Sequence, residues 1–387
     1  MRQSYITRTT LDSYSIVEVQ TVAESYHMAS TSTFRKLILN LHLWVGLVAA
    51  VLLLLIGGSG AMLVFETQID LALNPKLSRV TPTGTMLSLN ELKIALERQY
   101  PGHRVLELGI SESNDTAYEA YLQPASGDGI DVALDQYSGK ALGVWDDNRF
   151  ARKLHGFHTH FLSGKVGSAI VAGGAIFLLF LSLSGLILWW RSKIFGFSFQ
   201  SSGPKFQYDL HSTIGIVSSL FLLAFSLTGI VVHWEDAAGR WAKGVSHMPT
   251  ESPHPHPAKP APGAAPLEPT QLLSLAQGAV PGARATTVAL SDGAASPALV
   301  ILKYPEDHTP AGRTRILLDA YSGKILSLTN SRAAPAAVVF VTRLNREIHT
   351  GDIGGWPTRI LAAIFSLSLP LLALTGPLLW WQRRQRG

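Results

Sequence analysis

Apolar residues along this chain collect in four long runs that polar blocks separate. The runs occupy residues 37–65, 166–190, 214–234 and 360–381. A helix of about 20 apolar residues crosses the hydrocarbon core of a bilayer, so each run is long enough to span a membrane. The last three runs end in tryptophan, which is typical of the boundary between lipid and water. The pattern predicts an integral membrane protein with four transmembrane helices.

Basic residues beside the runs predict their orientation. Arg35 and Lys36 precede the first run, Arg191 follows the second, Lys205 precedes the third and Arg383 follows the fourth. Lys and Arg are enriched in the cytoplasmic segments next to membrane helices. We therefore expect both termini and the short loop between the second and third runs to be cytoplasmic, and the large polar blocks to lie on the other side.

Composition narrows the chemistry. Charged residues make up 15% of the chain, and a typical soluble protein has a markedly larger share. The chain has no cysteine, which excludes disulfides, thiolate catalysis, iron–sulfur clusters and covalently attached c-type haem. The net charge of +5 comes from residues beside the apolar runs, so we expect no nucleic acid partner. The segment before the first run holds no apolar signal-peptide core, and residues 1–27 read as a dispensable tail or as the product of an upstream start.

The first and third runs repeat each other. A histidine and a later small polar residue followed by glycine occur as His42 and Ser-Gly 59–60, then as His211 and Thr-Gly 228–229. The offset is constant, because 211 − 42 = 169 and 229 − 60 = 169. A residue that recurs at a constant offset in both copies is stronger evidence for a functional role than a residue that occurs once.

The second and fourth runs repeat each other in the same way. Ser-Gly at 184–185 corresponds to Thr-Gly at 375–376, because 375 − 184 = 191, and at that offset His158 falls on His349. The chain therefore consists of two tandem copies of a helix, an extramembrane domain and a second helix.

The two extramembrane blocks, 88–145 and 268–328, also match each other. Each begins with a helix-like segment, continues with alternating apolar runs typical of strands, and ends in the turn Asp-x-Tyr-Ser-Gly-Lys, at 135–140 and 319–324. We expect two small α+β domains, helix first, with this turn between the last two strands. The proline-rich stretch 249–268 reads as an extended spacer, with an adventitious metal site at His254 and His256 as the alternative.

These elements give a membrane α-helical fold class, with four transmembrane helices in an internal duplication and two small α+β domains. The expected boundaries are a cytoplasmic tail at 1–34, transmembrane helices at 35–66, 151–193 (with a His-rich lead-in), 207–240 and 336–387 (with a basic C-terminus), extramembrane domains at 67–150 and 268–335, a cytoplasmic loop at 194–206, and a Pro-rich linker at 241–267.

Histidines within or beside membrane helices are functional candidates, because polar groups are costly there. His42 and His211 lie just inside the cytoplasmic flanks, and His158 and His349 precede the outer ends of their helices. Two neutral imidazoles on facing helices are what a b-type haem requires, whereas packing and hydrogen bonding are the alternative role. We expect one haem at each pair. Three further histidines lie close enough to replace an outer ligand: His155, His160 and His233. As a further alternative, His155, His158 and His160 could form a metal site by themselves.

Over residues 35–386 the sequence resembles the PepSY-associated transmembrane family. The resemblance rests on Leu-His-x-Trp-x-Gly-Leu at 41–47, both Asp-x-Tyr-Ser-Gly-Lys turns, His-Thr-Gly at 349–351, and two Gly-x-x-Leu-Trp-Trp helix ends. Members resemble iron-regulated proteins of the bacterial inner membrane, and this chain is similar to the ferrioxamine-type siderophore reductases. The resemblance implies periplasmic PepSY-like domains, two b-type haems on the histidine pairs, and a ferric siderophore as substrate.

Three functions remain open at this point. The first is a ferric-siderophore reductase that takes electrons from quinol or a cytoplasmic reductase, with substrate contacts at Trp145, Arg149 or Trp356. The second is a non-enzymatic membrane protein that binds or regulates a periplasmic or membrane partner. The third is a transport component, which four helices without a charged residue near the midplane disfavour. No phosphate-binding loop or dinucleotide motif is found, so we expect electrons to come from another molecule.

Overall fold

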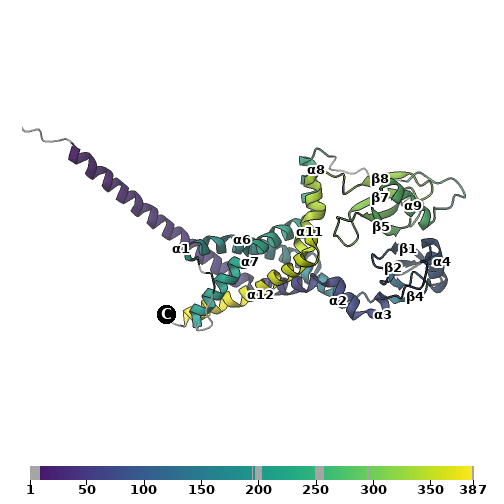
Figure 1. Cartoon of the computed structure of the whole chain (residues 1–387), viewed down its shortest axis with the longest axis horizontal. Coiled ribbons are helices and arrows are strands. Elements are labelled where there is room, and N and C mark those ends of the chain that lie inside the picture. Colours follow the sequence, from purple (N-terminus) through teal and green to yellow (C-terminus); the bar gives the residue numbers. More distant parts are fainter. Residues whose placement is uncertain (1–8, 194, 197–202, 249–256, 294–295, 386–387) are drawn as a thin grey trace, which may run out of the picture. The chain divides into compact units, whose positions relative to one another are not determined.

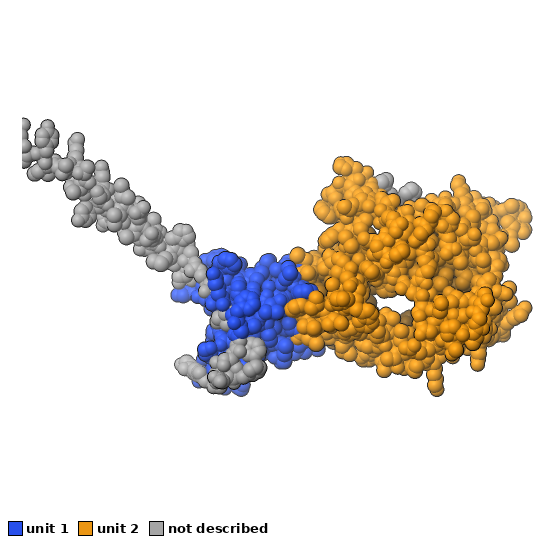
Figure 2. Space-filling view, viewed as in Figure 1, with its two compact units in different colours: residues 1–55, 176–223, 368–387 blue, residues 56–175, 224–367 orange. Residues whose placement is uncertain are grey.

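The computed structural model describes residues 9–193, 195–196, 203–248, 257–293 and 296–385, with side chains from residue 33 onward, Arg191 excepted. His254 and His256 lie outside the described residues. The chain divides into two compact units, coloured in Figure 2. Unit 1 contains residues 1–55, 176–223 and 368–387, and unit 2 contains residues 56–175 and 224–367.

In the part of the chain that the structure describes, four apolar segments are long enough to cross a membrane, which confirms the predicted spans. Their outward side chains are apolar and exposed: Val48 is 72% exposed, Val51 70% and Leu220 74%. Such surfaces are unfavourable in water and are covered by lipid in a membrane protein. The four segments are Thr33–Leu63 of α1 (Thr9–Leu63), Gly164–Trp190 of α6 (Gly164–Ser192), all of α7 (Gly203–His233) and all of α12 (Trp356–Arg384).

The His-rich lead-in before the second span is a separate helix, α5 (Phe150–His160). Phe161 and Leu162 take left-handed backbone angles, with φ of 46° and 55°, and so end α5 before α6 begins. In the second repeat, Gly351 ends the corresponding helix with φ of 82°. That helix is built from α10 (Ala336–Val339), a π-helical turn η1 (Phe340–Leu344) and α11 (Asn345–Thr350), and the 3₁₀ turn η2 (Asp352–Gly354) leads into α12.

Short helices follow the first and third spans. α2 (Glu66–Leu73) and α3 (Pro75–Ser78) follow α1, and α8 (Glu235–Val245) follows α7. The helix α8 therefore continues into the first residues of the stretch that the sequence assigns to the linker.

The extramembrane strands of the two α+β halves form one antiparallel sheet, which the sequence did not predict. Its order is β4-β3-β2-β1-β5-β6-β7-β8, with the two repeats joined where Leu108 on β1 pairs with Val288 on β5 (Figure 1). Each half alone would expose β1 or β5 as an unpaired edge, and joining the edges satisfies both. The strands are β1 (His103–Gly109), β2 (Tyr118–Pro124), β3 (Ile130–Leu134), β4 (Ala141–Val144), β5 (Arg284–Ala289), β6 (Ala298–Lys303), β7 (Thr314–Leu318) and β8 (Ile325–Thr329).

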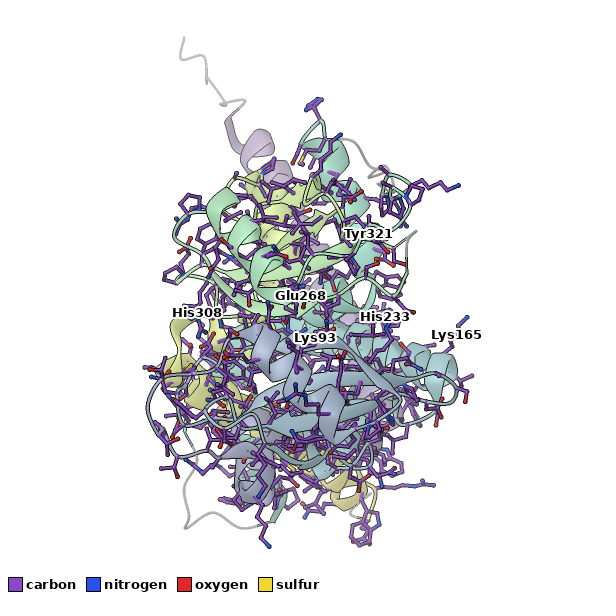
Figure 3. The ribbon with its side chains drawn as sticks, turned by 90° about the vertical axis from the view of Figure 1, so that its right-hand side faces the viewer. Lys93, Lys165, His233, Glu268, His308 and Tyr321 are labelled. Carbon is purple, nitrogen blue, oxygen red and sulfur yellow. The ribbon has the colours of Figure 1, made fainter. Side chains whose placement is uncertain are left out.

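Two helices pack against this sheet, α4 (Leu89–Gln99) and α9 (Pro269–Ala279), as the helix-first pattern predicts. Leu96 and Leu272 enter the same buried core as Leu108 and Val288. A capping box at the first turn of α4 and another at α9 satisfy free backbone N–H groups. The Lys93 ammonium lies 3.2 Å from the Glu268 carboxylate and links the two helices (Figure 3).

The two repeated turns lie between the last strands of each half, as predicted. Gly139 has φ of 70° and Gly323 has φ of 71°. Glycine adopts such angles without strain, because it has no Cβ atom. The Asp135 carboxylate accepts a hydrogen bond from the Tyr137 backbone N–H, and Asp319 accepts the equivalent bond in the second turn. These residues shape the hairpins and need no ligand to explain them.

Candidate functional site

Unit 1 brings together the first histidine pair, which we call the inner pair. His42 on α1 and His211 on α7 have ring centroids 6.5 Å apart and ring planes at 89°. One histidine comes from each repeat, at the positions that the offset of 169 relates. The sequence predicted that these two residues face each other.

Unit 2 contains the second pair, which we call the outer pair. His158 on α5 and His349 on α11 have ring centroids 6.4 Å apart and planes at 51°. Burial is the largest cause that lowers the pKa of each ring to about 4, so both imidazoles are neutral near pH 7. The neutral form is the one that coordinates a metal.

A hydroxyl group holds each ring of the inner pair. The Nδ1 atom of His42 lies 2.7 Å from Ser184 Oγ, and that of His211 lies 2.8 Å from Thr375 Oγ1. Each hydroxyl donates its own hydrogen to a backbone carbonyl one turn earlier, at 2.7 Å and 2.8 Å. The hydroxyl oxygen therefore accepts from the ring, so we assign the proton to Nδ1 and leave the lone pair of Nε2 free.

The outer pair repeats this arrangement. Ser59 Oγ lies 3.0 Å from His158 Nδ1, and Thr228 Oγ1 lies 2.9 Å from His349 Nδ1. Both hydroxyls again donate to carbonyls of their own helix, Ser59 at 3.1 Å and Thr228 at 2.6 Å. Sequence analysis found these Ser and Thr residues as markers of the repeat but gave them no role. The Ser and Thr positions recur at the same two offsets as the histidines, because 228 − 59 = 169 and 375 − 184 = 191, and this shared recurrence was the signal that could have identified them.

The glycine that follows each of these hydroxyl residues makes room for an imidazole. A Cβ atom added at Gly60 would lie 3.0 Å from the Cε1 atom of His158, and one at Gly229 would lie 3.2 Å from that of His349. The equivalent distances are 3.5 Å at Gly185, to His42, and 3.6 Å at Gly376, to His211. The Ser-Gly and Thr-Gly pairs therefore provide a hydrogen bond and close access to the ring at once.

The spacing within each pair fits one metal atom between two imidazoles. Two metal–nitrogen bonds of about 2 Å, plus about 1.1 Å from each nitrogen to its ring centre, would separate the centres by about 6.2 Å. The observed centroid distances are 6.5 Å and 6.4 Å. Among the described residues, no three His, Asp or Glu side chains form a metal-binding group. Two neutral imidazoles that face each other are a ligand set that a haem iron could accept, because the macrocycle would supply its other ligands.

The inner pair lines a cavity of about 460 Å³ within unit 1. Its walls are formed mainly by Leu, Ala and Gly residues, which suit the faces of an apolar macrocycle. Arg35, Tyr208 and Arg383 also line the cavity, and the Arg383 guanidinium lies 5.7 Å from the Tyr208 ring centre. Guanidinium groups bind carboxylates, so these residues fit the acidic arms of a haem.

The three alternative histidines lie outside both pairs. His155 Nδ1 is 3.2 Å from a Glu66 carboxylate oxygen, and His233 Nδ1 is 3.3 Å from Ser168 Oγ. His160 lines a different, polar cavity. Within the described part of the chain, none of the three takes part in a group that could hold a metal.

The comparisons with known proteins agree with the resemblance read from the motifs. The family model of the PepSY-associated TM region matches residues 39–383. This match includes all four histidines of the two pairs and the complete sheet. No curated protein matches the chain.

Proposed function

Given that the chain belongs to the PepSY-associated transmembrane family, we propose that it is a membrane oxidoreductase with two b-type haems. His42 and His211 would ligate one haem, and His158 and His349 the other. The observation that carries this proposal is the geometry shared by both pairs. Each pair has one imidazole from each repeat. The ring centroids lie 6.5 Å and 6.4 Å apart, which leaves room for one metal atom between the rings, and both Nδ1 atoms of each pair contact hydroxyl groups.

A haem held by two imidazoles supplies a one-electron carrier that alternates between Fe(III) and Fe(II). The protein's part is to keep its ligands neutral and correctly oriented. The hydroxyls of Ser184, Thr375, Ser59 and Thr228 fix the tautomer of each ring, and the neighbouring glycines let the rings approach the helices. Packing alone does not require four buried imidazoles that share this arrangement.

We further propose that the electron acceptor is a ferric siderophore and that iron leaves as Fe(II). The resemblance to siderophore reductases supports this substrate, and the absence of a nucleotide motif supports an external donor, quinol or a cytoplasmic reductase. Each Fe(III) takes up one electron. This reduction weakens the chelation of the iron by hard oxygen ligands, because Fe(II) stands low in the affinity order of the divalent metals. The basic flanks support a bacterial inner-membrane protein with cytoplasmic termini and a periplasmic sheet.

The test is a haem count on the purified full chain. Protein expressed with ample haem and extracted in detergent should contain two b-type haems by pyridine haemochrome assay, with reduced-minus-oxidised bands of bis-imidazole haem. His42→Ala and His158→Ala should each leave one haem. A protein without haem, or single variants that keep both, would refute the assignment and favour the partner-binding alternative.

A further inference from the structure

A second, polar cavity of about 270 Å³ lies within unit 2, beside the outer pair. Helix α5, which carries His158, forms part of its wall. Six ionisable side chains line the cavity: Glu66, Asp70, Arg149, Arg152, His155 and His160. The function proposed above uses none of them.

The charges around this cavity are largely matched. Arg149 Nε lies 3.1 Å from an Asp70 carboxylate oxygen, and the two arginines that line the cavity, Arg149 and Arg152, balance the two carboxylates, Glu66 and Asp70. Arg152 pairs with Asp131 at 3.0 Å. A ligand in this cavity would therefore meet little net charge, and hydrogen bonding would decide what binds.

Polar atoms that the ion pairs leave unused gather here. Arg149 Nη1 and His160 Nδ1 are shielded from solvent and have no hydrogen-bond partner among the described residues. The Arg149 guanidinium stacks over the Trp145 ring at 4.6 Å, and Trp145 Nε1 is likewise buried without a partner in the described part of the chain. Arginine and indole nitrogens only donate hydrogen bonds. Buried donors are normally satisfied, so the cavity is suited to a ligand rich in oxygen acceptors.

The second repeat has a different residue and a longer loop at the equivalent position. At the offset of 191, Gly156 of the cavity wall corresponds to Glu347, because 347 − 156 = 191. Glu347 is 2% exposed, and its carboxylate accepts a hydrogen bond of 2.9 Å from the backbone N–H of His308 (labelled in Figure 3). The loop that carries His308 runs from 304 to 313, whereas its counterpart in the first repeat spans only 125–129. The first repeat thus has glycine and a short loop where the second has a buried carboxylate and a long loop.

We propose that this cavity is where the electron acceptor docks, and that it takes the oxygen-donor face of an Fe(III) chelate with hydroxamate or carboxylate arms. The inference rests on the proposed reductase function and adds the substrate site to it. Oxygen atoms of one arm accept hydrogen bonds from Arg149 and His160, which both line the cavity, and the Trp145 ring stacks on the Arg149 guanidinium. One electron, supplied by the proposed activity, converts the bound Fe(III) to Fe(II), and no covalent bond to the protein forms.

The test measures binding without turnover. Gallium(III) desferrioxamine B has hydroxamate oxygens around a trivalent ion that the protein cannot reduce to a divalent state. We would titrate it by calorimetry into the full chain in detergent. Arg149→Lys keeps a cation beside Asp70 but removes the paired terminal nitrogens of the guanidinium. His160→Phe keeps an aromatic ring but removes its nitrogens. Each is expected to weaken binding about tenfold.

A matched control lies elsewhere in unit 2. Arg332 pairs with Glu306 at 2.8 Å and stacks over the Tyr304 ring at 3.8 Å, so it repeats the chemistry of Arg149 without lining the cavity. Arg332→Lys should bind the gallium chelate like the wild type.

The outcomes separate this inference from the haem proposal. Weaker binding by both cavity variants, with haem content and control binding unchanged, supports the docking site. Equal binding by wild type and cavity variants, or no binding by the wild type at millimolar chelate, overturns it. In either of those cases, two haems in the same preparations would leave the oxidoreductase proposal standing. A lack of haem would refute that proposal whatever the chelate does.

Discussion

Replacing Ser184 with alanine tests whether the hydroxyl partners govern the proposed haem ligands. Ser184 is 2% exposed, and its Oγ lies 2.7 Å from His42 Nδ1. Without the hydroxyl, the ring keeps a buried N–H with no acceptor, which costs about 2 kcal/mol. Loss of a hydrogen-bond partner behind a metal ligand typically weakens metal binding roughly 10- to 100-fold, and about 2 kcal/mol corresponds to roughly 30-fold. We expect Ser184→Ala to weaken haem binding at the inner pair by about this factor.

Two readouts follow the change. Haem titration into depleted protein measures affinity at the inner pair, and a redox titration measures its midpoint potential. The hydrogen bond from Nδ1–H makes the imidazole a stronger donor, which favours Fe(III), so its loss should raise the potential. A tenfold loss of preference for Fe(III) corresponds to about 59 mV for one electron. A role in helix packing alone would leave the potential unchanged.

The chain offers both a control and a rescue for this experiment. Ser182 lies on the same helix and lines the same cavity, but its buried Oγ has no hydrogen-bond partner among the described residues. Ser182→Ala should therefore leave haem affinity and potential unchanged. Ser184→Thr should restore both, because Thr375 fills the equivalent position in the second repeat. If Ser184→Ala matches the wild type in both readouts, the assigned role of the hydroxyl is wrong.

Three further predictions concern unit 2. Gly60→Ala places a Cβ 3.0 Å from an imidazole carbon of the outer pair and should reduce haem content at that pair in a haemochrome assay, whereas Gly58→Ala meets nothing within 4 Å and should not. Leu108→Ala removes a fully buried side chain beside the β1–β5 junction and should destabilise the sheet by about 2–5 kcal/mol, measured by denaturant unfolding. A hydrogen bond from Arg332 is the largest cause that lowers the pKa of Glu306, to about 2 from an ordinary 4.5. Its stabilising effect should therefore be complete above pH 4.5 and disappear as the pH falls toward 2, so melting curves of Glu306→Gln and wild type should converge at that acid end.

Sequence alone predicted the elements that depend on local pattern and on repetition. Apolar runs predicted four membrane helices, and constant offsets predicted that His42 would meet His211 and that His158 would meet His349. The joining of the halves was not predictable in this way. The alternating pattern of β1 is the same whether its outer edge pairs with β5 or stays free, because backbone groups make that contact.

The polar cavity was beyond sequence reasoning for a similar reason. Trp145 and Arg149 were named as substrate contacts, but nothing local indicated that Trp145 Nε1 and Arg149 Nη1 would be buried without partners among the described residues. The difference between Gly156 and Glu347 becomes informative only when the longer loop of the second repeat is seen to reach the carboxylate. Trp356, the third suggested contact, stacks on Phe65 with centroids 6.2 Å apart and does not line the cavity.

The hydrogen bonds to the histidines stay within one repeat, whereas each histidine pair combines residues of both repeats. Every hydroxyl–imidazole bond of the two pairs joins residues of the same repeat: Ser184 with His42, Ser59 with His158, Thr375 with His211 and Thr228 with His349. Each histidine pair instead takes one ring from each repeat. A chain of half this length would contain every supporting bond but only one ligand of each pair. Such a chain would complete its two sites only as a two-fold symmetric dimer. Fusion of the copies makes that symmetry permanent and frees each copy to diverge, as the open cavity on one side and the buried glutamate on the other illustrate.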